Sequence, residues 1–367
     1  RDNILITRGG DLSLQYDDII GLNDMRAGPA RDFLRLRCVQ AAMEYTTLGD
    51  TGTTVSKICL GCMSFGDSDW RDWVLDEDAG IELVDRAIEL GVNFFDTANM
   101  YSRGESERVL GTALSEYDRD EFVVASKVYF QMDDDDPNSG GLSRKAIEQE
   151  LDSSLDRLGM ETLDLLQIHR WDYDTPIEQT MRTLDDAVRR GEARHLGASS
   201  MWAHQFASAQ HTADRLGLTP FSTMQNHYNL LYREEEREML PLCEAQGVGV
   251  VPWSPLARGR LARPHEKADA TTRGESDDHA RRHPYVEGGG REVNERVQEL
   301  AAEKGVKMAQ IGLAWLFADD RVDAPIVGTT SVEHLEDAVE ALSIDLSASD
   351  VEYLEAPYEP VRVSGHE

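Results

Sequence analysis

Short apolar runs alternate with amphipathic stretches through most of the chain. The apolar runs have the length of strands that are buried on both faces, and the stretches between them show the three-to-four-residue spacing of helices. Helices are predicted over 79–91, 144–159 and 176–191, and the last two of these end at a glycine, as helices often do. Eight segments are predicted as strands: 57–61, 92–95, 122–127, 163–168, 193–198, 221–225, 248–252 and 324–328.

This order of elements predicts an α/β fold, a closed (β/α)8 TIM barrel, because consecutive parallel strands need a helical crossover between them. The alternative is an open doubly wound sheet. It is less favoured because the G-x-G-x-x-G turn typical of dinucleotide-binding sheets does not follow the first strand. Glycine-containing turn signals after Met43 predict an N-terminal β-hairpin ahead of the barrel.

The barrel is predicted to span 43–358, followed by a C-terminal tail at 359–367. Residues 1–42 have no sustained apolar period, so we interpret them as a poorly ordered N-terminal extension, with a genuine N-terminal arm as the alternative. Two polar segments, 131–141 and 263–290, are longer than ordinary connections. They follow the third and seventh strands, so both are expected as long loops on the C-terminal face of the barrel, where active sites lie.

The charge balance narrows the class of protein. The chain has 69 acidic residues against 37 lysines and arginines, a net charge of −32, and only six of those 37 are lysines. An acidic, lysine-poor surface keeps a protein solvated at high salt, so the composition predicts a halophilic archaeon, with an acidic mesophilic protein as the alternative. A nucleic-acid partner is not expected, because binding phosphate needs a basic face.

Membrane and secretion signals are missing from this sequence. It has no run of 18 apolar residues and no basic segment followed by an apolar stretch at its start. We therefore predict a soluble cytoplasmic protein without a membrane partner. The sequence does not indicate the oligomeric state.

The four cysteines include a C-x-x-C pair, Cys59 and Cys62, with Cys38 and Cys243 far from it. A thiol-redox or zinc function is one interpretation of such a pair. The favoured interpretation is that Cys59 and Cys62 pack as small apolar residues at the end of a buried strand.

Four ionisable side chains lie at or just after three successive predicted strands. Asp96 ends the second strand and Tyr101 follows five residues later. Lys127 ends the third strand, and His169 follows the fourth. In a barrel these strand ends meet at one mouth. Each residue alone is more often structural, but four on neighbouring strand ends indicate a catalytic cluster.

Such a cluster suits the reduction of a carbonyl group. A carbonyl that accepts a hydride becomes an alkoxide and needs a proton, which a tyrosine can donate. The ordinary pKa of tyrosine is about 10, and the ammonium of Lys127 is expected to lower the pKa of Tyr101. Asp96 would hold Lys127 charged and in place, and His169 would hydrogen-bond the carbonyl oxygen.

The sequence resembles the aldo-keto reductases from Met43 to about Tyr358. The motifs that carry the resemblance are DTANMYSRGESERVLG (96–111), SKVYF (126–130), LLQIHRWD (165–172) and VGVVPWSPLARGRL (248–261). Further stretches are similar to a bacterial and archaeal branch near aryl-alcohol dehydrogenases and versiconal hemiacetal acetate reductases: 143–159, 170–176 and 224–247. The resemblance implies a (β/α)8 barrel that reduces an aldehyde or ketone with NADPH, or catalyses the reverse oxidation. It implies a catalytic tetrad of Asp96, Tyr101, Lys127 and His169.

The resemblance also implies a cofactor site along the strand ends. Ser199, Ser200 and Gln225 correspond to residues that bind the nicotinamide carboxamide, although relatives often have asparagine in place of Ser200. Trp253 corresponds to the aromatic residue that stacks on the nicotinamide, with a core tryptophan as the alternative. The other implied contacts are Asp96, Gly61 and Met63 near the nicotinamide ribose, and Ser254, Pro255, Leu256, Arg258 and Gly259 around the pyrophosphate.

The adenosine end departs from the family pattern. Thr330 replaces a frequent basic residue for the 2′-phosphate, and Ala338 replaces the asparagine that binds adenine. The other residues at this end are Gly328, His334 and Asp337. NADPH is the predicted cofactor and NADH is the alternative, because arginines in or beside the long loop can supply a charge for the phosphate. These arginines are Arg260, Arg263 and Arg273.

The predicted substrate is a small-molecule carbonyl compound or alcohol. Met100, Phe130, Trp171 and Tyr228 are candidate substrate contacts, although each could equally be a core residue. Their apolar, aromatic character predicts aryl or medium-chain aldehydes. The alternative function is a non-enzymatic, cofactor-sensing regulatory protein like the potassium-channel β subunits. The catalytic histidine of the family is replaced in those proteins, whereas it is present here as His169.

Overall fold

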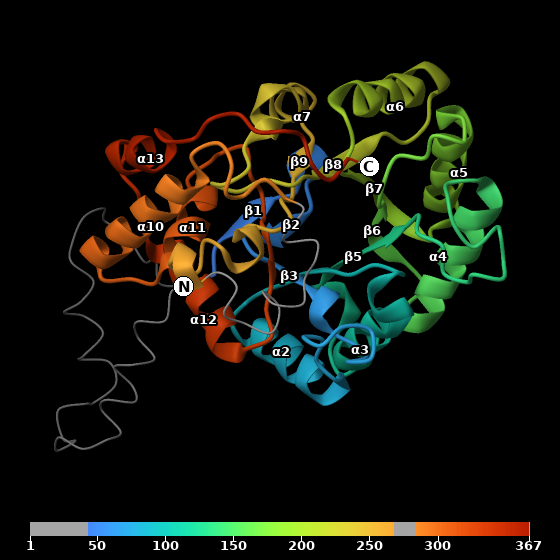
Figure 1. Ribbon diagram of the computed structural model, residues 1–367. Coiled ribbons are helices and arrows are strands. Elements are labelled where there is room, and N and C mark those ends of the chain that lie inside the picture. Colours follow the sequence, from blue (N-terminus) through green and yellow to red (C-terminus); the bar gives the residue numbers. More distant parts are fainter. Residues whose placement is uncertain (1–42, 268–282, 367) are drawn as a thin grey trace, which may run out of the picture. The chain divides into compact units, whose positions relative to one another are not determined.

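Eight parallel strands form a single sheet in the computed structural model, which describes residues 43–267 and 283–366 (Figure 1). The order in the sheet is β10-β3-β4-β5-β6-β7-β8-β9, so neighbours in sequence are neighbours in space. Each strand overlaps one of the eight predicted segments. The strands are β3 (Cys59–Gly61), β4 (Phe94–Asp96), β5 (Val123–Val128), β6 (Leu163–Ile168), β7 (Ala193–Ser199), β8 (Phe221–Gln225), β9 (Gly249–Val250) and β10 (Ile326–Gly328).

Backbone hydrogen bonds join the two edge strands of this sheet. The amide of Asp323 donates to the carbonyl of Val250 at 3.0 Å, and the amide of Ile326 donates to the carbonyl of Pro252 at 2.8 Å. The last strand thereby returns to the side of β9, and the sheet closes into the predicted (β/α)8 barrel.

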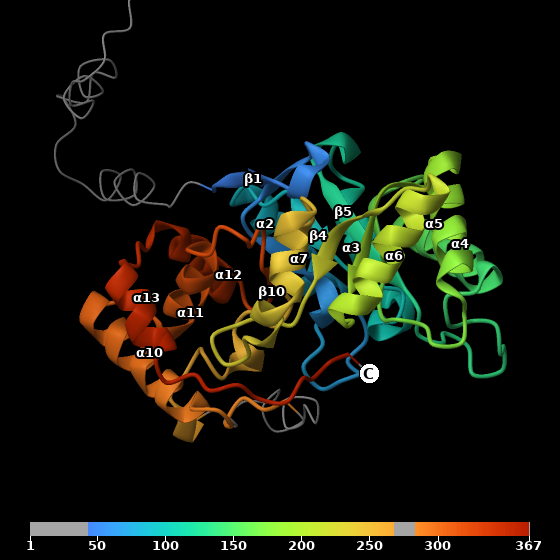
Figure 2. The ribbon, with the colours of Figure 1, turned by 90° about the horizontal axis from the view of Figure 1, so that it is seen from above.

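The helices surround the strands (Figure 1). They are α2 (Glu77–Glu89), α3 (Glu105–Leu114), α4 (Arg144–Leu158), α5 (Ile177–Arg190), α6 (Ala203–Leu216), α7 (Met239–Ala245), α10 (Gly290–Lys304), α11 (Met308–Phe317), α12 (Val332–Glu340) and α13 (Ala348–Glu355). The view from above shows α10 to α13 on one side of the strands and α4 to α6 on the other (Figure 2). Short 3-10 turns lie at 49–51, 62–64, 101–104, 119–121, 234–237, 257–259, 265–267 and 341–343. The three helices predicted from the sequence are α2, α4 and α5. Helix α4 shows why the prediction succeeds: Ser143 caps its first turn by accepting from the amide of Ala146, and Gly159 ends it in the left-handed conformation.

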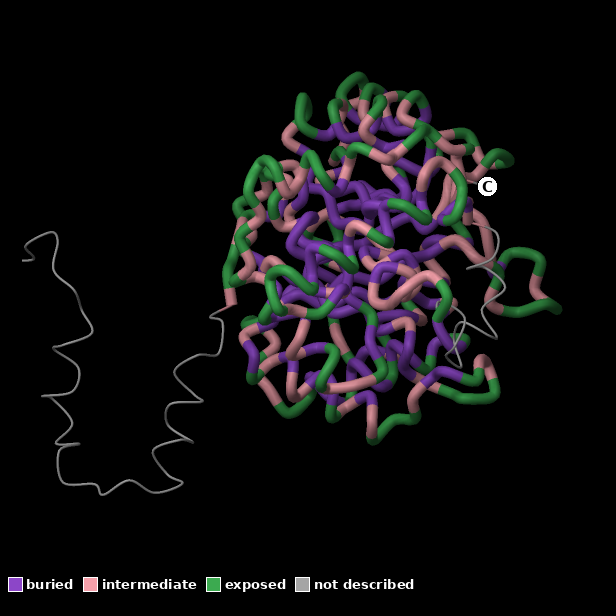
Figure 3. The backbone as a smooth tube through the Cα atoms, turned by 60° about the vertical axis from the view of Figure 1, so that its left-hand side comes forward, coloured by how far each residue is buried: buried purple, intermediate pink, exposed green. Residues whose placement is uncertain are grey.

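Apolar side chains form two cores on the two sides of the sheet. The larger core lies between the strands and the helices, and the smaller one fills the barrel interior with residues such as Phe94, Val123 and Leu165. Leu48 and Val55 belong to this inner cluster. They come from the antiparallel hairpin of β1 (Tyr45–Thr47) and β2 (Thr54–Ser56), as predicted, and the hairpin therefore seals one end of the barrel. Figure 3 shows the buried backbone concentrated in the middle of this unit.

Three expectations fall on residues that the structure does not describe. These are the N-terminal extension at 1–42, the central part of the 263–290 loop with Arg273, and Cys38. Within 43–267 and 283–366, no helix has the length and apolar character needed to cross a bilayer.

Candidate active site

The ammonium of Lys127 is the centre of the predicted cluster. It lies at the end of β5, fully buried, and donates to Asp96 Oδ2 at 2.6 Å, to the Thr97 carbonyl at 2.8 Å and to the Tyr101 hydroxyl at 3.3 Å. A lysine ammonium has three N–H donors, and three acceptors meet it here. Burial opposes this charge, but Asp96 and Tyr101 raise the pKa of Lys127 above its ordinary value. The lysine is therefore a permanent cation at neutral pH.

The phenol of Tyr101 lies in the 3-10 turn that follows β4. Burial raises the pKa of Tyr101, and this effect outweighs the neighbouring Lys127, which lowers the same pKa. The expectation of a lowered pKa is thus wrong, because the sequence reveals the ammonium but not how deeply the phenol is buried. Tyr101 keeps its proton at neutral pH.

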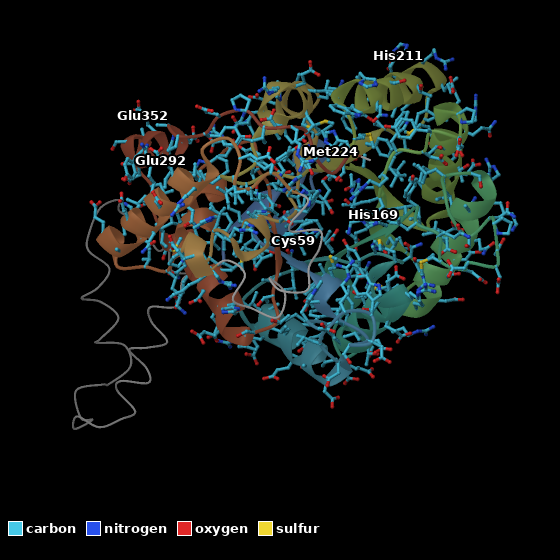
Figure 4. All side chains as sticks on the ribbon, in the orientation of Figure 1. Cys59, His169, His211, Met224, Glu292 and Glu352 are labelled. Atoms are coloured by element: carbon cyan, nitrogen blue, oxygen red, sulfur yellow. The ribbon has the colours of Figure 1, made fainter. Side chains whose placement is uncertain are left out.

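The imidazole of His169 lies just after β6, inside the ring of helices (Figure 4). Its ring meets Tyr101 edge-on with 5.8 Å between centroids, and Phe130 edge-on at 4.9 Å. Burial, with the charges of Arg170 and Lys127, lowers the pKa of His169 well below 6.5. His169 is therefore neutral at neutral pH, and its buried Nδ1 has no hydrogen-bond partner among the described residues.

Two glutamines bind the second oxygen of the Asp96 carboxylate. Gln225 donates to Oδ1 at 2.8 Å and Gln167 donates to it at 3.0 Å. Gln167 was not among the predicted site residues. The available signal was a polar residue within the apolar strand LDLLQI. Its neighbour in the sheet is Gly197, where a Cβ atom would lie 2.9 Å from Gln167 Cγ, so the glycine makes room for the amide.

The predicted carboxamide contacts lie together at the ends of β7 and β8. The hydroxyls of Ser199 and Ser200 are 3.2 Å apart, and the indole of Trp253 donates to Ser200 Oγ at 2.9 Å. The amide nitrogen of Gln225 is used inside the protein, by Asp96 and by Gln167 Oε1 at 3.2 Å. Any contact of Gln225 with a carboxamide would therefore use its oxygen or replace one of these hydrogen bonds.

Trp253 is partly exposed and packs against the inner core cluster. One face of its indole stacks on His227, with 4.1 Å between centroids and 11° between planes. His227 stacks in turn on Tyr232 with the same separation. The indole is thus held rigidly from one side.

Strained backbone is concentrated at the C-terminal ends of the strands. Among the described residues other than glycine, those with positive φ follow β4, β7 and β9: Ser102, Arg103, Ser200, Ser254, Ala257 and Arg258. Non-glycine residues in this conformation are disfavoured and are often found at functional sites. Asn229 supports the loop after β9 by donating to the Ser254 carbonyl at 2.9 Å. This loop also contains the predicted pyrophosphate contacts Pro255, Leu256, Arg258 and Gly259.

The predicted ribose and adenosine contacts lie beside each other around β3 and β10. Gly61 pairs with Gly328 in the sheet, and Met63 follows Gly61 in a partly exposed turn. Thr330 and His334 are exposed. Asp337 is already engaged, because its carboxylate accepts from Lys307 at 2.8 Å. Arg260 and Arg263 are partly buried beside the loop after β9.

The candidate substrate contacts fall into two groups. Met100, Phe130 and Trp171 are partly exposed, and Phe130 lies against His169. Tyr228 is fully buried, and its hydroxyl shares its single proton between Glu236 at 2.7 Å and Asp319 at 3.0 Å. The expectation for Tyr228 is therefore wrong: the chain turns after β8 and directs this side chain into the core.

The C-x-x-C cysteines are free thiols and fully buried. Burial, followed by the charge of Asp96, raises the pKa of both thiols well above its ordinary value. A thiol-redox function needs an accessible thiolate, so these findings favour packing over redox chemistry.

The aldo/keto reductase family model matches residues 57–359. An aldo-keto reductase of Metarhizium robertsii is 43% identical, covering 89% of this chain and 94% of its own length. Versiconal hemiacetal acetate reductase of Aspergillus parasiticus is 42% identical over 87% of this chain and 98% of its own. A Schizosaccharomyces pombe protein whose name includes aryl-alcohol dehydrogenase is 42% identical over 88% of this chain and 97% of its own length.

The chain belongs to the aldo/keto reductase family. It is an NAD(P)H-dependent oxidoreductase that acts on a small molecule. The predicted similarity to aryl-alcohol dehydrogenases and versiconal hemiacetal acetate reductases is confirmed. The relatives are fungal, however, rather than bacterial or archaeal. They give no support to a halophilic archaeal origin, which rests on the acidic composition alone.

Proposed function

We propose that this aldo/keto reductase uses NADPH to reduce an aldehyde or ketone to an alcohol, with Tyr101 as the proton donor, and that the same groups serve the reverse oxidation. The observation that carries the proposal is the buried Lys127 ammonium, which touches the carboxylate of Asp96 and the hydroxyl of Tyr101 together. A phenol beside a fixed cation can release a proton, because the resulting phenolate is stabilised where it forms.

Each tetrad residue has a separate task in this proposal. Tyr101 gives its proton to the carbonyl oxygen, and Lys127 stabilises the phenolate that remains. Asp96 offsets the lysine charge where both side chains are buried. His169 is neutral, so it can donate a hydrogen bond to the same oxygen and orient the carbonyl without competing as an acid. The bound nicotinamide supplies the hydride.

The residues at the strand ends fit a nicotinamide dinucleotide. The partly exposed, rigidly held indole of Trp253 offers a surface for a flat ring, and the Ser199 and Ser200 hydroxyls lie beside it. The strained turn at 254–259 has the backbone form that exposes amides to a phosphate. The preference for NADPH is supported by Arg260 and Arg263, which can offset the negative charge of a 2′-phosphate.

The direct test combines binding and turnover in the purified protein at high salt. Titrations with NADPH and NADH in parallel, followed by quenching of tryptophan fluorescence, should give the tighter binding for NADPH. Tyr101→Phe should retain this binding and lose aldehyde reduction by about 100-fold or more, the usual contribution of a general acid. Unchanged turnover in Tyr101→Phe would refute the role of the phenol, and tighter binding of NADH would refute the cofactor preference.

A further inference from the structure

We infer that Arg170 binds an anionic group of the substrate, so that the enzyme prefers carbonyl compounds that carry a carboxylate. This inference deepens the proposed function and rests on it. Arg170 follows His169 directly, and its side chain donates to the His169 carbonyl at 2.6 Å. Its guanidinium lies 5.8 Å from the centre of the Phe130 ring, and that ring packs against the His169 imidazole. A group bound to Arg170 would therefore lie beside the proposed carbonyl site.

Arg170 has no carboxylate partner among the described residues, although the chain contains 69 acidic residues. Six other partly buried arginines are neutralised by ion pairs: Arg86, Arg119, Arg157, Arg233, Arg296 and Arg321 each pair with an aspartate or glutamate. Removing a guanidinium from water without a counter-charge is costly. Among the described residues Arg170 thus lacks the counter-charge that these six arginines have.

The groups that face Arg170 also favour an anion. The phenols of Tyr101 and Tyr129 and the cation of Arg258 are its electrostatic neighbours. Burial and the charge of Arg258 both lower the pKa of Arg170, so they disfavour its positive charge. The two phenols do not offset that charge, because they are uncharged at neutral pH. Lys127 adds little net charge because Asp96 neutralises it at 2.6 Å. Arg170 therefore carries its charge beside the reacting groups without a carboxylate partner among the described residues, within a molecule whose total charge is −32.

The remaining donors of Arg170 define the chemistry of the ligand. A guanidinium has five N–H donors, and one hydrogen bond to the His169 carbonyl leaves a pair that can bind both oxygens of a carboxylate. Phe130 adds a flat apolar wall on the same side. Aromatic aldehydes with a ring carboxylate match both features. A cofactor phosphate has the same anionic chemistry, and the experiment separates it from the substrate carboxylate.

The test compares 2-, 3- and 4-carboxybenzaldehyde with their uncharged methyl esters, using the full chain and NADPH. In the unmodified enzyme, kcat/KM for at least one acid should exceed that of its ester by about tenfold or more, as expected for a charge-assisted hydrogen bond. Arg170→Gln should remove this preference, mainly through a higher KM for the acid, and Arg170→Lys should keep part of it. The matched control is Arg215→Gln, which removes the cation of an exposed ion pair between α6 and Glu178 of α5 and should keep the preference intact.

Binding of 4-(hydroxymethyl)benzoate and benzyl alcohol to the NADPH complex, measured by calorimetry, separates this inference from the proposed function. Weaker binding of the carboxylate alone in Arg170→Gln supports the inference even if no aldehyde is turned over. Equal acid-to-ester ratios in the unmodified enzyme and Arg170→Gln would overturn it. So would weaker NADPH binding in Arg170→Gln with the acid preference unchanged, because Arg170 would then serve the cofactor. Circular dichroism melts of the variants show whether the fold is retained.

Discussion

Burial and a neighbouring ammonium act on the Tyr101 phenol in opposite directions. Burial is the larger effect, so the pKa of Tyr101 lies above 10, while the pKa of His169 lies below 6.5. Tyr101 therefore keeps its proton, and His169 stays neutral, over the whole neutral range. We expect kcat for aldehyde reduction with saturating NADPH to stay level from about pH 6.5 to about pH 9. A fall with a midpoint near pH 7 or 8 would mean that Lys127 prevails over burial.

Asp96 accepts on both carboxylate oxygens, from Lys127 on one and from Gln167 and Gln225 on the other. Asp96→Asn would turn an N–H toward one of these donors and remove the counter-charge of the lysine. We expect kcat to fall by about 10- to 100-fold, the range for losing one charge-assisted hydrogen bond. Stopped-flow measurement of the first turnover is the appropriate assay. Asp85→Asn on α2, which alters a hydrogen bond from Tyr117, should keep the rate of the unmodified enzyme.

The site residues differed in how far the sequence could predict them. Asp96, Lys127 and His169 end or follow apolar runs, so the barrel topology alone brings them to one mouth. Gln167 was missed because the sequence does not show which residue lies opposite it in the sheet. The register places it opposite Gly197, where there is room for its amide to reach Asp96. Tyr228 was misplaced because the turn after β8 decides the direction of its side chain, and local sequence does not encode that direction.

At the scale of elements, the strands were predicted well because both of their faces are buried. Such strands are short apolar runs with few competing interpretations, as in VNFF and LDLLQI. Helix ends were also predictable where a local cap marks them, as Ser143 and Gly159 do for α4. The closure of the barrel depends on hydrogen bonds between Val250 and Asp323, which are distant in sequence. The eight predicted strands suggest a closed barrel, but the sequence does not show which residues make the closing contacts.

The hairpin that seals the barrel depends on a partly buried carboxylate. Asp323 Oδ2 accepts from the Gly49 amide at 2.7 Å, and burial, with a smaller effect of Asp50, raises the pKa of Asp323 to about 6. Below about pH 4 this carboxyl is protonated in both the folded and the unfolded chain. Between about pH 4 and pH 6 the folded chain binds more protons than the unfolded chain, so stability falls as the pH rises.

Asp323→Asn removes this titration while keeping an oxygen that can accept from Gly49. We expect the variant to match the unmodified protein near pH 4 and to be more stable at pH 7 by about 1–3 kcal/mol. Urea midpoints at both pH values measure the difference between the two proteins. Asp50→Asn should give a smaller gain, because Asp50 is the lesser cause of the shift. Lower stability of Asp323→Asn at pH 7 would show that the charged hydrogen bond outweighs the cost of burial.

Over the whole molecule, the net charge of −32 sets the response to salt. Surface ion pairs such as Arg144–Glu148 and Arg215–Glu178 stabilise by only about 0–1 kcal/mol each, and salt weakens them. Repulsion among the excess acids acts over longer distances, and the Debye length shrinks from about 10 Å at 0.1 M salt to about 3 Å at 1 M. Relief of repulsion should therefore exceed the loss of ion pairs, so we expect added salt to stabilise the fold.

We expect Tm to rise by about 3–6 °C between 0.1 M and 1 M KCl, which corresponds to about 2–4 kcal/mol for a domain of this size. Sodium sulfate at equal ionic strength separates screening from the general stabilising effect of sulfate. If screening dominates, most of the gain is complete by about 0.5 M, where the Debye length is already shorter than the spacing of most surface charges. A Tm that stays level in KCl and rises only in sulfate would mean that the acidic surface is not under repulsive strain. The halophilic interpretation of the composition would then lose its physical basis.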